Sequence, residues 1–203
     1  MSFDYVEVYH RIVDEYAAGR EPNESMRRVI DECASRRPHP DWEWLRQLPY
    51  GDLSALEEWI EKPLQLDPPS ERQAGLWFGM FNPYVGDEPV ADIYISGSKE
   101  FDPDPFTFEW ACGPDWRPDD RYANSEVMAM IYRIAYAADD GLKNDAEYPL
   151  CLAYGALAIR ALLNGLDPAL IPATIVGAGV AVGFDSGDGI LLGRLTSNGL
   201  EPS

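Results

Sequence analysis

Apolar side chains in the first seventy residues recur at steps of three and four. In the opening segment this stripe contains Tyr5, Tyr9, Ile12 and Tyr16. Shorter stripes with the same period follow at residues 26–33 and 53–60. This spacing places side chains on one face of an α-helix. Residues 1–70 are therefore predicted to form a helical N-terminal part in which each helix buries one face.

The pattern changes to a period of two over residues 75–111, which predicts three strands. The segment AGLWFGMF is apolar on both faces, as in the central strand of a sheet. VADIYIS alternates apolar residues with Asp92, Tyr94 and Ser96, and FTFEW places Phe106, Phe108 and Trp110 on one side. Turn-forming residues separate these runs, so the three strands are predicted to form a meander.

Two helices and a β-hairpin are predicted for the remainder. The helical period returns over residues 123–165, where EYPLCLAYGALAIRALLNG is apolar on nearly all sides. Its most apolar stretch, residues 148–163, contains Arg160 and is short for a membrane span, which favours a buried helix. Over residues 174–196, TIVGAGVAVGF and GILLGRL flank a short segment of Asp, Ser and Gly, the pattern of a hairpin.

These elements predict an α+β fold in a single domain over residues 1–203. The sheet is expected to be mostly antiparallel with about five strands, three from the meander over residues 75–111 and two from the hairpin over residues 174–196. Helices from residues 1–70 and 123–165 are expected to pack on this sheet.

The chain is strongly acidic, with 35 acidic and 16 basic residues and a formal net charge of -19 at pH 7. Such a surface repels phosphate backbones and anionic lipids, so direct binding to nucleic acid or to a membrane is not expected. The same charge attracts basic proteins and accelerates their encounter. The expected partner is therefore a protein with a basic surface.

The cysteines and the N-terminus favour a cytoplasmic location. Cys33, Cys112 and Cys151 are far apart and include no C-x-x-C pair, which is typical of reduced thiols in a cytosol. The opening segment MSFDYVEVYHRIVDEY carries acidic residues and lacks the basic start and apolar stretch of a secretory signal.

No cofactor or metal is predicted from the motifs, although a metal site remains an open alternative. In FDSGDG, an EF-hand loop starting at Asp185 would need oxygen ligands where Gly187 and Gly189 stand, so the match fails. Asp185 and Asp188 could still share a divalent cation with a distant carboxylate such as Asp102. This arrangement would indicate a carboxylate-dependent metal enzyme.

The remaining motifs favour structural roles. The glycines at positions 177, 179 and 183 are spaced somewhat as in a dinucleotide-binding loop, but they lie in a strand pattern that leads into another strand. Close packing against a neighbouring helix is the expected reason for them. The chain has only two histidines, which gives little material for a zinc site or a Ser-His-Asp triad, and no catalytic residues are predicted.

Acidic residues are densest between residues 86 and 120, where ten acids stand against two basic residues. Aromatic residues, the types that anchor protein interfaces, are interleaved with them in the same loops. These loops are the predicted binding surface for a protein partner. The candidate residues are Tyr84, Asp87, Glu88, Glu100, Phe101, Asp102, Asp104, Asp115, Trp116, Asp119 and Asp120.

The chain as a whole resembles the small cytosolic immunity proteins encoded beside bacterial polymorphic or contact-dependent toxins. The resemblance is carried by its size and acidity and by the segments GLWFGMFNPYVGDEPVADIYISGS, WRPDDRYANSEVMAMIYRIAY and GVAVGFDSGD. It implies neutralisation of a toxin domain, expected to be basic, by tight binding. A second alternative with the same electrostatics is a DNA-mimicking inhibitor of a nucleic-acid-binding protein.

Overall fold

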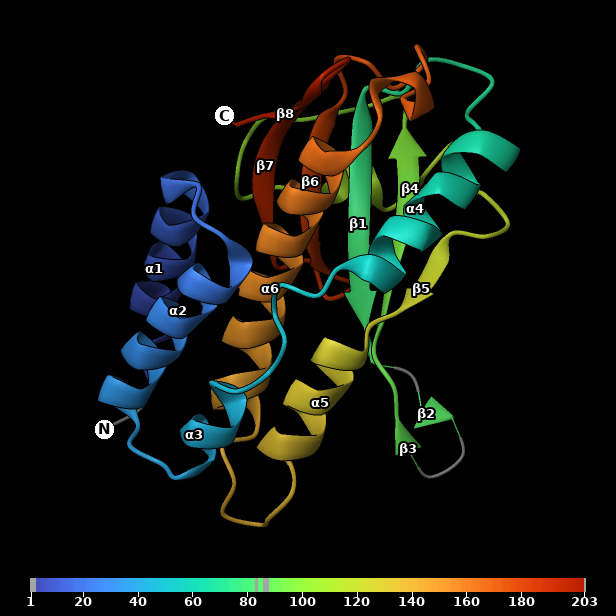
Figure 1. The fold of residues 1–203 in the computed structure, drawn as a ribbon. Helices are drawn as coiled ribbons and strands as arrows, with labels where there is room; N and C mark the ends of the chain where they lie inside the picture. The colour runs from blue at the N-terminus through green and yellow to red at the C-terminus, as the bar shows by residue number, and fades with distance from the viewer. Residues whose placement is uncertain (1–2, 83, 86–87, 203) are drawn as a thin grey trace.

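A six-stranded mixed sheet forms the centre of the molecule in this computed structural model, which describes residues 3–82, 84–85 and 88–202 (Figure 1). The strand order is β5-β4-β1-β6-β7-β8. The strands are β1 (Gly75–Phe81), β4 (Asp92–Ser98), β5 (Tyr122–Asn124), β6 (Gly179–Phe184), β7 (Gly189–Thr196) and β8 (Gly199–Glu201). A separate two-stranded ribbon pairs β2 (Tyr84–Val85) with β3 (Glu88–Pro89).

The central pair of the sheet is parallel and joins two antiparallel halves. β1 runs parallel to β6, with Gly75 opposite Gly179 and Met80 opposite Phe184. The other neighbouring pairs are antiparallel. The predicted α+β class is confirmed, and the predicted antiparallel sheet of five strands is close to the observed mixed sheet of six.

Helices cover one face of the sheet, where α6 (Asn144–Gly165) lies along β6 and β7 (Figure 1). The other helices are α1 (Tyr5–Ala18), α2 (Pro22–Arg36), α3 (Asp41–Leu45), α4 (Ser54–Leu66) and α5 (Glu126–Ala135). α1, α2 and α5 pack on α6, and α4 lies beside β5. The predicted helical segments 1–70 and 123–165 therefore form one layer, as expected from their apolar stripes.

α6 is buried on almost all sides. By length and composition it could cross a membrane, but 78% of its most apolar window lies inside the protein. Such burial is typical of the core helix of a soluble domain. α6 meets the sheet at Gly155. A methyl group at this position would lie 2.6 Å from the Met80 sulfur, so the close contact favours glycine.

Polar groups join α1 to α2 and α1 to the sheet. The carboxylate of Glu15, 2% exposed, accepts hydrogen bonds from Arg11 at 3.3 Å and from Arg20 at 2.7 Å. The Ser25 hydroxyl on α2 donates to the same carboxylate at 3.4 Å. The Tyr16 hydroxyl donates to the Leu192 carbonyl oxygen of β7 at 2.5 Å.

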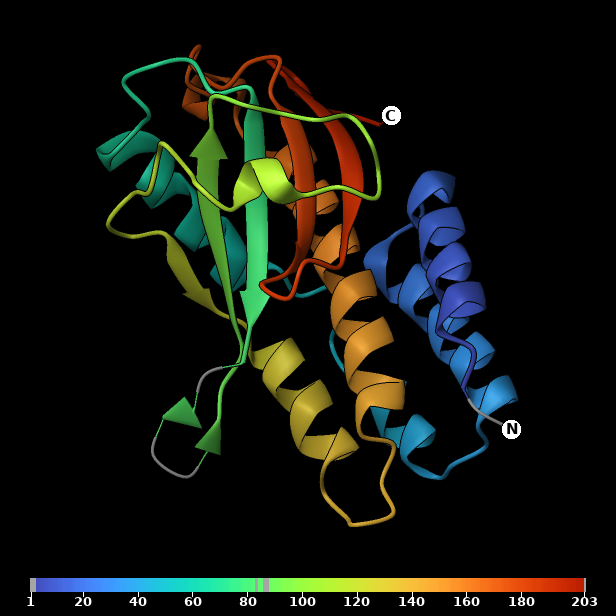
Figure 2. The same ribbon diagram turned by 180° about the vertical axis from the view of Figure 1, so that it is seen from behind.

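The prediction of a third strand at FTFEW is wrong. Residues 99–121 instead form a long loop that crosses the sheet face opposite the helices, with one short 3-10 helix, η1 (Glu109–Ala111) (Figure 2). Phe108 and Trp110 are buried against the sheet, whereas Phe106 is 79% exposed. The alternation gave burial correctly for two of the three residues. The segment forms no strand, because the Thr107 and Ala111 N–H groups donate to the nearby Asp104 and Phe108 carbonyl oxygens. The third strand of the N-terminal half is β5, which pairs with β4.

Glycines on the loop-covered face of the sheet make room for aromatic rings. A methyl group at Gly79 would lie 2.1 Å from the Tyr94 ring. Tyr94 is the partner of Gly79 across the β1–β4 pair, so the ring lies flat over its neighbour's backbone. The absence of a Cβ is what permits this approach.

The glycines of β6 have the same role, and their predicted packing against a helix is wrong. A methyl group at Gly179 would meet the Phe101 ring at 2.1 Å, and one at Gly183 would meet the Trp77 ring at 2.6 Å. Both rings belong to the cluster that contains Phe108 and Trp110 of the loop, and not to the helix side of the sheet. Gly177 precedes the strand with a φ of 89°, which favours glycine.

Candidate functional site

The loop over the sheet face opposite the helices carries an exposed end, which we name the acidic tip and define as residues 100–106. Asp102 Oδ1 accepts a hydrogen bond from the Asp104 backbone N–H at 2.9 Å, and Asp104 Oδ1 accepts one from the Phe106 N–H at 2.9 Å. Such side-chain turns, with Pro103 and Pro105 between them, limit the conformations of the tip. Phe106 is thereby held in solvent at 79% exposure.

A hollow of about 320 Å³ lies beside Phe106, where the acidic tip, α1 and the β6–β7 turn meet. Val6, on the α1 side, is 66% exposed. Asp188 and the ring of Tyr9 also line the hollow. An exposed ring next to an apolar depression with carboxylates around it is the composition of a protein-binding surface.

Of the predicted binding residues, Glu100, Asp102 and Asp104 lie together on the acidic tip and are exposed. The two predicted aromatic anchors of the loop face inward. Phe101 packs on Trp110 with ring centroids 5.2 Å apart, and the Trp116 indole N–H donates to the Asp67 carbonyl oxygen at 2.8 Å. These rings fix the loop to the body of the protein.

The remaining predicted acids of the loop lie elsewhere. Asp115 accepts a hydrogen bond from the Lys99 backbone N–H at 2.8 Å. Asp119 and Asp120 are exposed beside α4, where the Trp59 indole N–H donates to the Asp120 carbonyl oxygen at 3.0 Å. The tip is directed towards α1, so the two acidic groups occupy opposite ends of the loop (Figure 2).

The other three predicted residues belong to the segment between β1 and β4. Asp87 lies outside the residues that the structure describes, as do the side chains of Tyr84 and Glu88. The backbone of their ribbon, β2–β3, lies beyond the end of the sheet away from the acidic tip (Figure 2).

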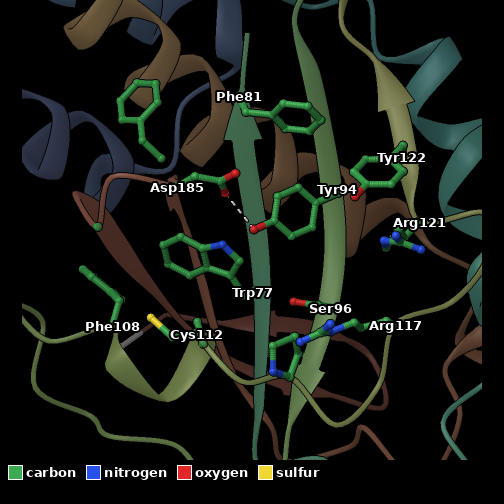
Figure 3. A pocket seen from close by; sticks show the side chains of 14 residues that line it. Trp77, Phe81, Tyr94, Ser96, Phe108, Cys112, Arg117, Arg121, Tyr122 and Asp185 are labelled. Carbon is green, nitrogen blue, oxygen red and sulfur yellow. Dashed lines mark hydrogen bonds between the residues drawn. The ribbon is translucent and has the colours of Figure 1, made fainter. Parts of the chain in front are cut away.

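A second depression, of about 510 Å³, lies between η1 and β5 on the sheet face opposite the helices, and we name it the aromatic cup (Figure 3). Its rings come from three strands. The centroids of Phe81 and Tyr94 are 6.0 Å apart, and each is 5.7 Å from the centroid of Tyr122. Trp77 forms the floor beside Tyr94 (Figure 3).

Polar groups stand at opposite sides of the aromatic cup. On one side the Tyr94 hydroxyl donates to Asp185 Oδ1 at 2.8 Å (Figure 3). Burial, reinforced by this hydrogen bond to a carboxylate, raises the pKa of Tyr94. Tyr94 therefore remains a neutral donor at physiological pH.

Two arginines occupy the other side of the cup. The Arg121 guanidinium lies 4.5 Å from the centroid of the Tyr122 ring and donates to the Pro118 carbonyl oxygen at 3.1 Å. Arg117 extends towards Ser96 (Figure 3). Within the described part of the chain, Arg117 makes no hydrogen bond or ion pair.

The residues weighed as metal ligands are not assembled into one site. Asp185 is engaged by Tyr94, whereas the Asp188 carbonyl oxygen accepts the Phe184 N–H and closes the hairpin. Among residues 3–82, 84–85 and 88–202, no group of three or more His, Cys, Asp or Glu side chains could hold a metal ion. FDSGDG thus forms the turn of the predicted hairpin.

Comparison of the chain with known protein families, with characterised proteins and with solved structures finds no match. The site is therefore interpreted from its own geometry. Sequence reasoning missed Phe106 as an exposed residue and did not identify the aromatic cup. The signals were present, since Asp-Pro-Asp-Pro is a turn sequence and Tyr94 is on the outward side of its strand.

Proposed function

We propose that this protein is a cytoplasmic immunity protein that binds and neutralises a basic toxin domain through the acidic tip. The observation that carries the proposal is Phe106. A large ring at 79% exposure costs solvation free energy, and the two Asp side-chain turns hold it in that position. A partner that covers the ring recovers this energy without ordering the loop, whose entropy is already lost.

Charge around the tip selects the partner. Glu100, Asp102 and Asp104 are exposed on a chain of net charge -19. Carboxylates surrounding an aromatic anchor accelerate encounter with a basic surface, and burial of the ring then slows dissociation. Toxin domains that grip phosphate groups present such basic surfaces, so a nuclease-type domain fits this chemistry.

The test is direct binding to a partner captured from the source cells and then purified. Phe106→Ala should weaken binding by about 30-fold, the effect of removing a central aromatic anchor. The double variant Asp102→Lys and Asp104→Lys should lower the association rate and reduce its dependence on salt. The partner should also be toxic when produced alone and harmless when produced together with this protein.

Matched controls lie on other parts of the surface. Trp44, on α3, is 63% exposed, so Trp44→Ala removes an exposed ring of similar kind. Asp139→Lys with Asp140→Lys reverses the same amount of charge in the exposed turn between α5 and α6. If the control variants weaken binding as much as the tip variants, the acidic tip is not the interface. A captured partner without toxicity would contradict the immunity role.

A further inference from the structure

The aromatic cup has the features of a small-molecule site. The proposed protein interface at the acidic tip does not account for these features. Its volume of about 510 Å³ lies within the range of roughly 300–1,000 Å³ that is usual for ligand pockets. Six of its fourteen lining residues are aromatic, and a few polar groups stand at defined positions. Such sites bind flat ligands by stacking and orient them by the polar groups.

The cationic side of the cup indicates the charge of the ligand. Arg117 and Arg121 are the two arginines that line the cup, and neither makes an ion pair with a carboxylate among the described residues. Arg117 makes no hydrogen bond or ion pair with any described residue, and its neighbour Arg121 is held by a carbonyl oxygen and a ring. The guanidinium groups therefore retain donors for an anionic group such as a phosphate, whose several oxygens can accept from both arginines.

Ser96 supplies a further donor on the same side. This residue is 2% exposed, lines the cup and makes no side-chain hydrogen bond with any described residue. Its hydroxyl therefore has a hydrogen free to donate to a ligand in the cup. Across the cup, the Asp185 carboxylate accepts one bond from Tyr94 and has lone pairs left for an amino group of a ligand.

We infer that the aromatic cup binds a ligand of the nucleoside monophosphate class, which combines a planar aromatic base with an anionic phosphate. The ring system stacks on Trp77 and Tyr94, the phosphate contacts Arg117, Arg121 and Ser96, and a ring amino group donates to Asp185. The inference concerns the isolated protein and does not depend on the proposed interaction with a toxin.

The experiment is calorimetric titration of the purified protein with AMP, CMP, adenosine and inorganic phosphate. At least one of the two nucleotides should bind with a Kd below about 1 mM, and its affinity should exceed those of adenosine and phosphate because ring and anion act together. Arg117→Gln should weaken nucleotide binding by about 10-fold. Arg133→Gln on α5, a residue paired with Glu126, removes the same charge and should leave binding unchanged.

The exposed thiol of Cys112 gives a second measurement, because this residue lines the cup. A bound nucleotide should slow alkylation of Cys112 by N-ethylmaleimide, and Arg117→Gln should remove that protection. The inference is overturned if neither nucleotide binds, if adenosine and phosphate bind as well as the nucleotides, or if Arg117→Gln and Arg133→Gln have equal effects.

Discussion

At the scale of single residues, aromatic rings that lie over glycines shape the sheet face opposite the helices. Tyr94 lies over Gly79, and Trp77 lies over Gly183. Each glycine removes a Cβ from the position that the ring occupies, so the rings contact backbone and their edges form the walls of the aromatic cup. The cup therefore depends on residues that contribute no side chain.

Gly79→Ala should destabilise the protein by about 1–3 kcal/mol, because the new methyl group would lie 2.1 Å from the Tyr94 ring. Chemical denaturation monitored by circular dichroism measures this change. Gly113→Ala is the control, since no atom lies within 4 Å of a methyl group placed there. Equal stability of the two variants would show that the Tyr94 ring moves aside at little cost.

The sequence predicts some of these residue positions and not others. Tyr94 alternates with buried isoleucines, which places it correctly on the outer side of β4. Phe106 fits the same type of alternation with Phe108 and Trp110, yet it is the exposed member of the three. Alternation records which residues are apolar, whereas exposure of Phe106 results from hydrogen bonds of Asp102 and Asp104 that have no periodic signal.

At the scale of elements, one buried carboxylate joins α1 to α2. Glu15 is 2% exposed and accepts hydrogen bonds from Arg11, Arg20 and Ser25. The arginines remain 35–39% exposed, so water screens part of their attraction to the carboxylate. The hydrogen bond from Ser25 and the burial of Glu15 fix the position of α2 relative to α1.

Glu15→Ala should reduce the free energy of unfolding by about 1–3 kcal/mol, since it leaves the buried Ser25 hydroxyl without its acceptor and opens space between the two helices. Thermal and urea unfolding would give the value. Glu24→Ala is the control, because Glu24 pairs with Arg20 and Arg28 at the exposed surface, where such pairs contribute little. A larger loss for Glu24→Ala would contradict the role given to Glu15.

The type of most long elements follows from the sequence, whereas their pairing does not. The apolar period of residues 123–165 correctly gives two helices, and the hairpin over residues 174–196 is present as β6 and β7. β5 and β8 are three residues long, too short to produce a period. β1 and β6 are about 100 residues apart in the chain, and the chain between them includes α6. A pattern of neighbouring residues cannot predict that these two strands pair in parallel.

At the scale of the whole molecule, buried and half-buried tyrosines are expected to lower the stability of the protein at alkaline pH. Burial raises the pKa of Tyr16, Tyr148 and Tyr154 to about 12, compared with the usual value of 10.0. In the unfolded chain these phenols would ionise near pH 10. The folded state therefore binds more protons than the unfolded state above that pH, and its stability falls as pH rises.

We expect the free energy of unfolding to be independent of these phenols below pH 10 and to decrease as the pH rises from 10 to 12. Ultraviolet absorbance of tyrosinate and helical circular dichroism should change together, because the buried phenols ionise when the protein unfolds. Complete ionisation of the tyrosines near pH 10 with the helical signal intact would contradict this expectation.

The parallel contact between β1 and β6 also determines when the chain can fold during synthesis. Gly75 pairs with Gly179, so the middle of the sheet cannot close until β6 has left the ribosome. Until then β1 has β4 on one edge and an unpaired backbone on the other, and α6 exposes the apolar face that later packs on β6, β7 and β8. A ribosome that stalls between α6 and β6 would therefore release a product prone to aggregation, whereas loss of the residues after β8 would leave the central seam intact.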